Sequence, residues 1–173
     1  WNAEDVSERA LVIKAPESGG TVGGYETDDT LLGSAHADSL YGGSGDDILE
    51  GKGGDDYLAG GSGDDTYVWN LGDGDDAIYD YEGKNVLKLG DGAVPSQVEA
   101  SRDNSHLYLT FSQTGERLTV QNWYCDDVYK LDGVEFGDGS GWKASDGKTI
   151  EEYFAERTEA ASPAEAPESF VDS

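Results

Sequence analysis

Residues 42–68 read GGSGDDILE, GKGGDDYLA and GGSGDDTYV, which is one nine-residue unit repeated three times without a gap. Each unit opens with glycine, carries an aspartate at its sixth position and places a large apolar residue at its eighth. Glycine adopts positive φ at little cost, so it permits tight turns. The apolar residue supplies one core side chain per unit. Self-similarity at a fixed period predicts a solenoid in which each unit stacks on its neighbours.

The period continues on both sides of this stretch. Upstream, residues 24–32 and 33–41 keep the first glycine, the aspartate and the leucine in phase. Downstream, the register slips by two residues, and residues 71–79 then resume the pattern. The outer units contain fewer glycines, so we interpret them as degenerate terminal units of one repeat block that spans residues 24–79.

The spacing also predicts where each part of a unit lies. The last three residues alternate as x-apolar-x, which is a minimal strand with one side chain pointing inward. The first six residues form a turn, so two units make one coil and alternate units stack directly. The predicted fold is therefore all-β, a parallel β-roll with aspartates along two flanks. Asp29, Asp47 and Asp65 line one flank, and Asp38, Asp56 and Asp76 line the other.

The chain alone is not expected to hold such a roll together. Residues 26–80 contain 15 acidic residues and a single lysine, Lys52. Carboxylates in coils about 4.8 Å apart repel by roughly 3 kcal/mol at an effective dielectric near 20. A divalent cation between coils would remove this repulsion, and an all-oxygen cage of carboxylates and carbonyls favours Ca²⁺ over Mg²⁺. Without calcium, we expect this Gly/Asp-rich segment to be disordered.

The units resemble the nonapeptides of RTX (repeats-in-toxin) proteins, strongly at residues 42–68 and less closely at 24–41 and 71–79. The resemblance implies a β-roll with several Ca²⁺ ions between its turns. Their ligands would be sixth-position aspartates and carbonyl groups of the glycine turns. Carried onto this sequence, the implied ligands are Asp47, Asp56 and Asp65, with the carbonyls of Gly43, Gly45, Gly54, Gly61, Gly63 and Gly74.

Three further aspartates, Asp29, Asp38 and Asp76, are weaker candidates because their units are degenerate. The unit at residues 33–41 departs most from the pattern, so we expect an incomplete site there. The acids at the fifth position of the strong units raise a separate question. We expect most of them to face solvent or to lie behind the metal ligands; they are Asp46, Asp55 and Asp64.

Residues 80–157 alternate apolar and polar residues like half-buried strands and resemble the domain that follows the repeats in many RTX proteins. A solenoid needs a cap at its open end, and we predict that role here. The alternative is a sugar-binding site built from its aromatic residues, among them Trp123 and Trp142. Strands are predicted at 85–89, 107–111, 118–120 and 128–136, and a helix at 149–157 with a Thr149–Glu152 capping box.

The two ends of the chain have simpler interpretations. We interpret residues 1–23 as an N-terminal connection, with an edge strand at residues 10–13. Residues 158–173 are rich in Ala, Glu, Ser and Pro, so we predict a disordered acidic tail or linker. A chain without methionine is expected to be a piece of a larger protein.

Composition limits the partners. A formal net charge of −26 argues against nucleic acid and anionic membrane surfaces. No apolar run is long enough to form a transmembrane segment. Motifs for nucleophilic, zinc-protease or phosphate-loop chemistry are missing from the sequence, so we predict no catalytic residues, no organic cofactor and no enzyme activity. A monomer is expected.

Two functions remain open at this point. RTX proteins leave Gram-negative bacteria through a type I secretion system, so the resemblance implies a module that is secreted or displayed at the cell surface. Such a module would fold on Ca²⁺ after export, where millimolar calcium suits weak extracellular sites, and would serve a larger toxin, enzyme or adhesin. The alternative is a calcium-stabilised adhesin module that binds a glycan or a partner through the aromatic residues of the cap.

Overall fold

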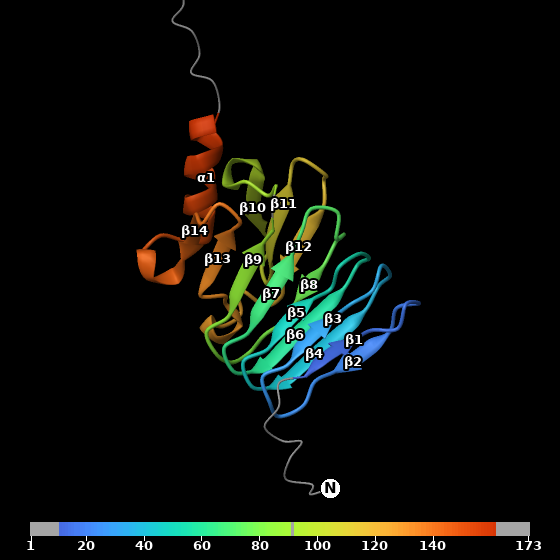
Figure 1. The fold of residues 1–173 in the computed structure, drawn as a ribbon. Helices are drawn as coiled ribbons and strands as arrows, with labels where there is room; N and C mark the ends of the chain where they lie inside the picture. The colour runs from blue at the N-terminus through green and yellow to red at the C-terminus, as the bar shows by residue number, and fades with distance from the viewer. Residues whose placement is uncertain (1–10, 91, 162–173) are drawn as a thin grey trace, which may run out of the picture.

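Two stacked β-sheets wind into a parallel β-roll that is closed at its C-terminal end by further strands and one helix (Figure 1). This computed structural model describes residues 11–90 and 92–161, with the side chains of 158–161 left out. The coils run from β1 and β2 at one end to the C-terminal elements and α1 at the other. The predicted all-β roll is confirmed.

The strands alternate between the two sheets along the repeats. The first sheet contains, in spatial order, β1 (Val12–Lys14), β3 (Thr30–Leu32), β5 (Ile48–Glu50), β7 (Thr66–Trp69), β9 (Val86–Leu89), β13 (Gly133–Phe136) and β14 (Gly141–Lys143). The second contains β2 (Thr21–Gly23), β4 (Ser39–Ser44), β6 (Tyr57–Ser62), β8 (Ala77–Ile78), β12 (Arg117–Val120), β11 (Leu107–Phe111) and β10 (Val98–Arg102).

The strand register reproduces the sequence period. Leu31 pairs with Leu49 and Leu49 with Tyr67, so one coil takes two nonapeptides. The next step on each sheet is two residues longer, with Leu58 opposite Ile78 and Tyr67 opposite Leu87. The two inserted residues are therefore absorbed in a turn while the strands stay in register.

One column of side chains on each sheet fills the space between the sheets. Leu31, Leu40 and Leu49 are fully buried, as the eighth-position pattern predicts. Their neighbours in sequence face outward because successive side chains of a strand point to opposite faces. The same burial holds for Leu58, Tyr67, Ile78 and Leu87.

The roll extends beyond the repeats that sequence alone revealed. Strands β1 and β2 pair in parallel with β3 and β4, each 18 residues from its partner. The predicted edge strand thus exists as β1 at the free edge of the first sheet. At the other end, residues 80–88 contribute β9 and make one more unit. Its turn contains Gly83 with φ 100°.

The C-terminal elements continue both sheets of the roll. Strand β12 pairs in parallel with β8, and β13 pairs in parallel with β9. Antiparallel partners β10, β11 and β14 then complete the sheets. The rings of Trp69 and Phe111 stack at 4.1 Å between centroids and so join the last coils to this region.

Three of the four strands predicted in this region lie where expected, as β9, β11 and β12. The prediction at 128–136 is wrong over its first half, because only Gly133–Phe136 is a strand. Asp127–Tyr129 forms the 3-10 turn η3 instead, with the Asp126 carboxylate accepting from the Val128 N–H at 3.4 Å. Aspartate favours such local capping over extended structure. Two further 3-10 turns are η2 (Pro95–Gln97) and η4 (Ala144–Asp146).

Helix α1 (Ile150–Ala161) begins with the predicted capping box. The Glu152 N–H donates to Thr149 Oγ1 at 3.2 Å, and the Thr149 N–H donates to the Glu152 carboxylate at 2.9 Å. The helix is longer than predicted and includes residues 158–161, which were expected in the tail. Alanines at 160 and 161 favour helix, and the chain reaches a proline only at 163. The rest of the predicted tail, residues 162–173, lies outside the described residues.

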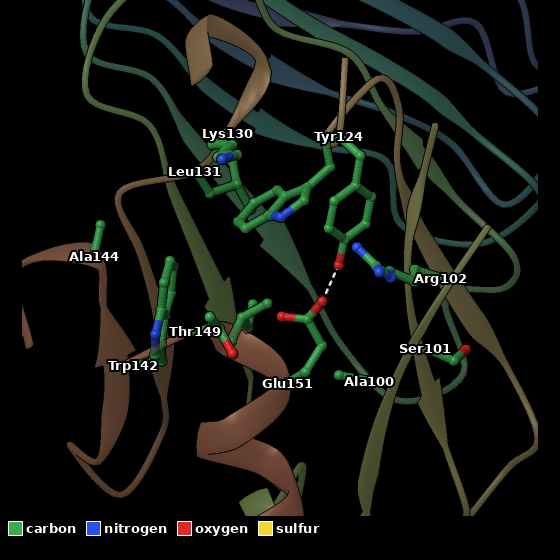
Figure 2. Close-up of a pocket in the computed structure, with 12 residues that line it drawn as sticks. Ala100, Ser101, Arg102, Tyr124, Lys130, Leu131, Trp142, Ala144, Thr149 and Glu151 are labelled. Atoms are coloured by element: carbon green, nitrogen blue, oxygen red, sulfur yellow. Dashed lines mark hydrogen bonds between the residues drawn. The ribbon is translucent and has the colours of Figure 1, made fainter. Parts of the chain in front are cut away.

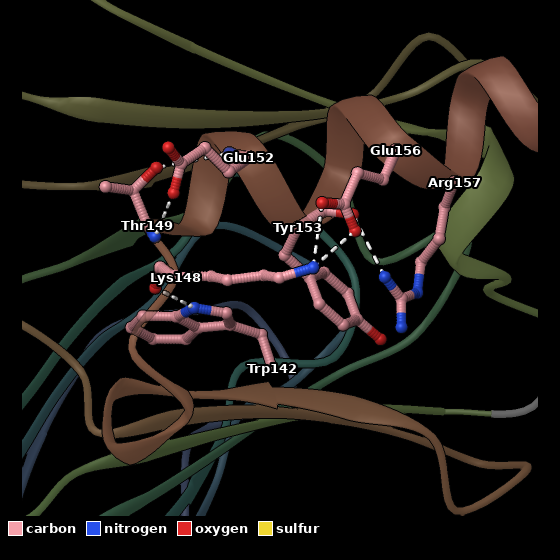
Figure 3. A network of polar contacts seen from close by, with 7 residues as sticks. All are labelled: Trp142, Lys148, Thr149, Glu152, Tyr153, Glu156 and Arg157. Atoms are coloured by element: carbon pink, nitrogen blue, oxygen red, sulfur yellow. Dashed lines mark hydrogen bonds and ion pairs between the residues drawn. The ribbon is translucent and has the colours of Figure 1, made fainter.

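Polar contacts fix the base of this helix (Figure 3). Lys148 pairs with Glu156 at 2.7 Å, and the Trp142 indole N–H donates to the Lys148 carbonyl at 2.9 Å. The Arg157 guanidinium lies 3.5 Å from the centre of the Tyr153 ring. Neither α1 nor any other helix in the described part of the chain has the length and apolar character that crossing a bilayer requires.

Candidate metal sites

The sixth-position aspartates form two hydrogen-bonded ladders along the flanks of the roll. One carboxylate oxygen, Oδ1, of each accepts the backbone N–H of the equivalent residue one coil earlier. On one flank, Asp29 N–H donates to Asp47 at 2.7 Å and Asp47 N–H donates to Asp65 at 2.8 Å. On the other, Asp38 N–H donates to Asp56 at 2.7 Å and Asp56 N–H to Asp76 at 2.8 Å. The aspartates predicted to share a flank therefore do so.

The second oxygen, Oδ2, has no partner in the three strong units. Asp47, Asp56 and Asp65 are each at most 3 % exposed, and their Oδ2 atoms are buried without any hydrogen bond. A buried carboxylate oxygen without a partner carries the full desolvation penalty. The ion pairs among the described side chains involve Lys130 and Lys148 of the C-terminal region, not these aspartates.

The electrostatics of the ladders follow from this burial. Burial, together with the charge of neighbouring carboxylates, raises the pKa of Asp47 and of Asp56 to about 6. Burial likewise raises the pKa of Asp65 to about 7 and that of Asp76 to about 8. At neutral pH the buried flanks therefore disfavour the ionised form of these carboxylates when no cation is bound. A bound cation would favour the ionised form.

Glycines make room for the unpaired oxygens. A Cβ atom added at Gly42, Gly51 or Gly60 would lie less than 3.0 Å from Oδ2 of the aspartate in the same unit. Cβ atoms in proteins essentially never come that close to another atom. These first-position glycines were not predicted as site residues, although their recurrence in every strong unit was the available signal. The six glycines predicted to offer carbonyls all have φ between 113° and 128°: Gly43, Gly45, Gly54, Gly61, Gly63 and Gly74.

The two degenerate units differ at the same oxygen. Asp29 Oδ2 accepts the Tyr25 N–H at 2.8 Å, and Asp38 Oδ2 accepts the Ser34 N–H at 2.6 Å. Both donors occupy the second position, where the strong units have glycine or lysine at positive φ. The chain itself therefore satisfies the oxygen that remains free in the strong units.

The donor set fits a hard cation held largely by backbone oxygens. Within residues 11–90 and 92–161, no three His, Cys, Asp or Glu side chains converge as metal ligands. Each turn supplies one buried carboxylate oxygen, so carbonyl groups of the glycine turns would complete any coordination shell. Carboxylates and carbonyls together suit Ca²⁺.

Comparison with known families agrees with this chemistry. Residues 23–58 and 32–67 match the model of the RTX calcium-binding nonapeptide repeat (4 copies). The repeats are RTX nonapeptides. Residues 106–146 match the haemolysin-type calcium binding protein related domain. RTX repeats are structural calcium-binding modules.

A curated relative shares part of this chain. The iron-regulated protein FrpA of Neisseria meningitidis serogroup C is 33 % identical over 101 residues, which cover 54 % of this chain and 9 % of FrpA. The chain thus spans less than a tenth of that relative's length.

The fifth-position acids of the RTX units form outer ladders. Asp46 N–H donates to Asp28 at 2.8 Å, Asp64 N–H to Asp46 at 2.8 Å and Asp75 N–H to Asp55 at 3.1 Å. These carboxylates are exposed and accept from the following coil, whereas the sixth-position acids accept from the preceding one. They face solvent and also tie successive turns together.

The last unit of the roll, residues 80–88, closes its flank without a sixth-position acid. Asn85 takes that place, and its Oδ1 accepts the Asp65 N–H at 2.8 Å. Asp80 stands where glycine is usual, is 2 % exposed, and accepts from the Tyr67 hydroxyl and from the N–H groups of Tyr81 and Glu82. Sequence reasoning missed this closure because the unit lacks the glycine and aspartate signature.

Proposed function

We propose that this chain binds Ca²⁺ along both flanks of its roll and folds as it does so. Three buried oxygens without a hydrogen bond carry the proposal: Oδ2 of Asp47, Asp56 and Asp65. Bound Ca²⁺ would supply the positive charge that the repeat block lacks. The carbonyls of the positive-φ glycines would provide the remaining oxygens.

The hydrogen bonds also rank the weaker candidates. Asp29 and Asp38 are not expected to bind metal in the same way, because their Oδ2 atoms already accept backbone N–H groups. Asp76 lies on the ladder of Asp38 and Asp56, and burial raises its pKa to about 8. We therefore keep Asp76 as a ligand and place the calcium-dependent part of the roll between residues 42 and 79.

The wider role follows from coupling between metal binding and folding. In the calcium-poor cytosol the repeat block would stay unfolded and able to pass through a type I exporter. Outside a Gram-negative cell, calcium would drive folding of this module within a larger toxin, enzyme or adhesin. The RTX match supports this context, since RTX proteins are typically secreted by Gram-negative bacteria. No catalytic role is assigned to the chain itself.

A sugar site on the tryptophans of the C-terminal region gains no support from their placement. Trp123 and Trp142 are each 4 % exposed and pack in the core. They border a pocket of about 630 Å³ (Figure 2). There the Tyr124 hydroxyl donates to Glu151, and the Arg102 guanidinium lies 4.7 Å from the centre of the Tyr124 ring. The Tyr124 ring, its hydroxyl and the charged groups beside it thus already have partners within the protein.

Far-UV circular dichroism and hydrodynamic radius, titrated with calcium and then with magnesium, test the proposal. We expect a cooperative gain of β-structure with compaction that calcium causes and magnesium does not. Asp56→Asn should shift the calcium midpoint upward, because an amide nitrogen would replace Oδ2. Asp55→Asn, an exposed neighbour, is the matched control. A chain that is compact and β-rich in excess chelator would refute the proposal.

A further inference from the structure

We propose that the outer face of the second sheet binds an uncharged glycan chain through a contiguous group of tyrosines. This tyrosine face comprises Tyr41, Tyr57, Tyr79, Tyr81 and Tyr129. These are half of the ten tyrosines in the chain. They come from β4, from β6, from the segment after β8 and from η3, so four separate parts of the chain contribute to one surface.

Ring contacts connect the members of this face. The Tyr41 and Tyr57 ring centres lie 5.8 Å apart, and Tyr79 lies 6.3 Å from Tyr81 and 5.8 Å from Tyr129. Burial raises the pKa of the Tyr57 hydroxyl, and electrostatic interactions with Tyr41 and Tyr79 contribute to the same shift. Tyr41 remains 45 % exposed and Tyr81 47 % exposed. The rings therefore form a strip that is open to solvent.

The roll portion of this face carries no charge, although the chain has a net charge of −26. From β2 to β8, the outward residues of the second sheet are Thr21, Gly23, Ser39, Tyr41, Tyr57, Ala59, Ala77 and Tyr79. Over the matching strands β1 to β7, the outward positions of the first sheet include the charged residues Lys14 and Glu50. The outward tyrosine rings of these strands thus belong to the second sheet.

The chemistry of this face selects the occupant. A pyranose ring offers a C–H face that packs on an aromatic ring, and its hydroxyls can exchange hydrogen bonds with tyrosine and threonine side chains. Acidic ladders border the sheet on both flanks and repel anionic polymers. A basic partner would be drawn to those acidic ladders rather than to the uncharged strip between them. A neutral polysaccharide is the ligand that matches both the strip and its borders.

The tyrosine face exists only when the coils are stacked, so the inference rests on the proposed function to that extent. The two can fail separately. If calcium does not fold the chain, the proposed function fails. If the calcium-folded chain ignores neutral glycans, only the present inference fails.

Affinity electrophoresis in saturating calcium tests the inference, with circular dichroism of each sample to verify folding. The gels contain dextran, laminarin or hydroxyethyl cellulose as neutral polymers, and alginate or polylysine as charged ones. At least one neutral polymer should retard the protein, and added salt should leave the retardation unchanged. Tyr41→Thr/Tyr57→Thr should weaken it about tenfold, with threonine chosen because it suits strands. Tyr25→Thr, at a tyrosine 64 % exposed outside the face, should have no effect.

Three outcomes would overturn the inference. The first is a folded protein that no neutral polymer retards. The second is equal retardation of the wild type and the double variant. The third is retention by polylysine alone that salt abolishes, which would indicate a basic partner on the acidic ladders instead.

Discussion

In each strong RTX unit, the two oxygens of the sixth-position aspartate have different environments. In Asp56, Oδ1 holds the preceding coil through the Asp38 N–H, while Oδ2 is buried and free. In Asp38, both oxygens accept backbone N–H groups. The same residue type at the same repeat position is therefore a structural hydrogen-bond acceptor in one unit and a candidate metal ligand in the next.

The space beside Oδ2 provides a prediction at the residue scale. Gly51→Ala should weaken calcium binding and destabilise the calcium-bound roll by about 1–3 kcal/mol, because the new Cβ would collide with Asp56 Oδ2. Gly53→Ala is a matched control, since the nearest atom to its Cβ is Ala35 Cα at 3.5 Å. Calcium titration and urea unfolding of both variants measure the difference. Equal effects of the two substitutions would contradict this view of the first-position glycine.

At the scale of an element, the closing turn of the roll is held by the side chain of Tyr67. Its hydroxyl donates to Asp80 and accepts the Gly60 N–H at 2.8 Å. The hydroxyl thus links the turn at residues 60–65 to the turn at residues 80–85. This tyrosine replaces the leucine or isoleucine that the other repeat units carry at the eighth position, so the last coil gains a polar clamp.

Removing that clamp should destabilise the folded chain. Tyr67→Phe removes the hydroxyl that bonds the Gly60 N–H and Oδ2 of Asp80, at a cost of about 1–3 kcal/mol. Tyr57→Phe, on the outer face of β6, should cost much less. Urea unfolding in saturating calcium compares the two. A Tyr67→Phe variant as stable as the wild type would show that the clamp does not support the last coil.

How much could be predicted from sequence differs between elements. The strands of the repeats were predictable because the position of Leu49 and Leu58 in the period sets both register and burial. Strand β2 was missed, although the edge strand β1 was predicted, since residues 15–23 place no aspartate at the sixth position. The closure by Asp80 and Asn85 was missed for the same reason. Aspartates with an unpartnered Oδ2 could not be told from those with both oxygens hydrogen-bonded, because that distinction depends on the second-position backbone.

At the scale of the whole molecule, folding without calcium brings many buried carboxylates together in a chain of net charge −26. The folded-state pKa values of Asp47, Asp56, Asp65 and Asp76, about 6 to 8, all exceed the ordinary value of 3.8. The calcium-free fold thus binds more protons than the unfolded chain between these limits. These four aspartates therefore contribute most to its stability below about pH 4, and that contribution is lost as pH rises through their folded pKa values.

This linkage predicts opposite pH dependences for the free and bound forms. In excess chelator, the chain should show more β-structure at about pH 5 than at about pH 8, whereas calcium affinity should rise with pH because the metal displaces protons. Circular dichroism and calcium titration at both pH values measure the two trends. Substituting the four aspartates by asparagine should flatten the dependence of the chelated form. An unchanged dependence in that variant would assign it to other groups.

Counting the calcium ions bound per chain, by equilibrium dialysis at saturation, tests the central claim most directly. The claim is that free Oδ2 atoms, rather than sixth-position aspartates as such, mark the sites. Asp47→Asn/Asp65→Asn should therefore bind fewer ions than the wild type, and Asp29→Asn/Asp38→Asn should bind the same number. Loss of as many ions in the second variant as in the first would contradict the account.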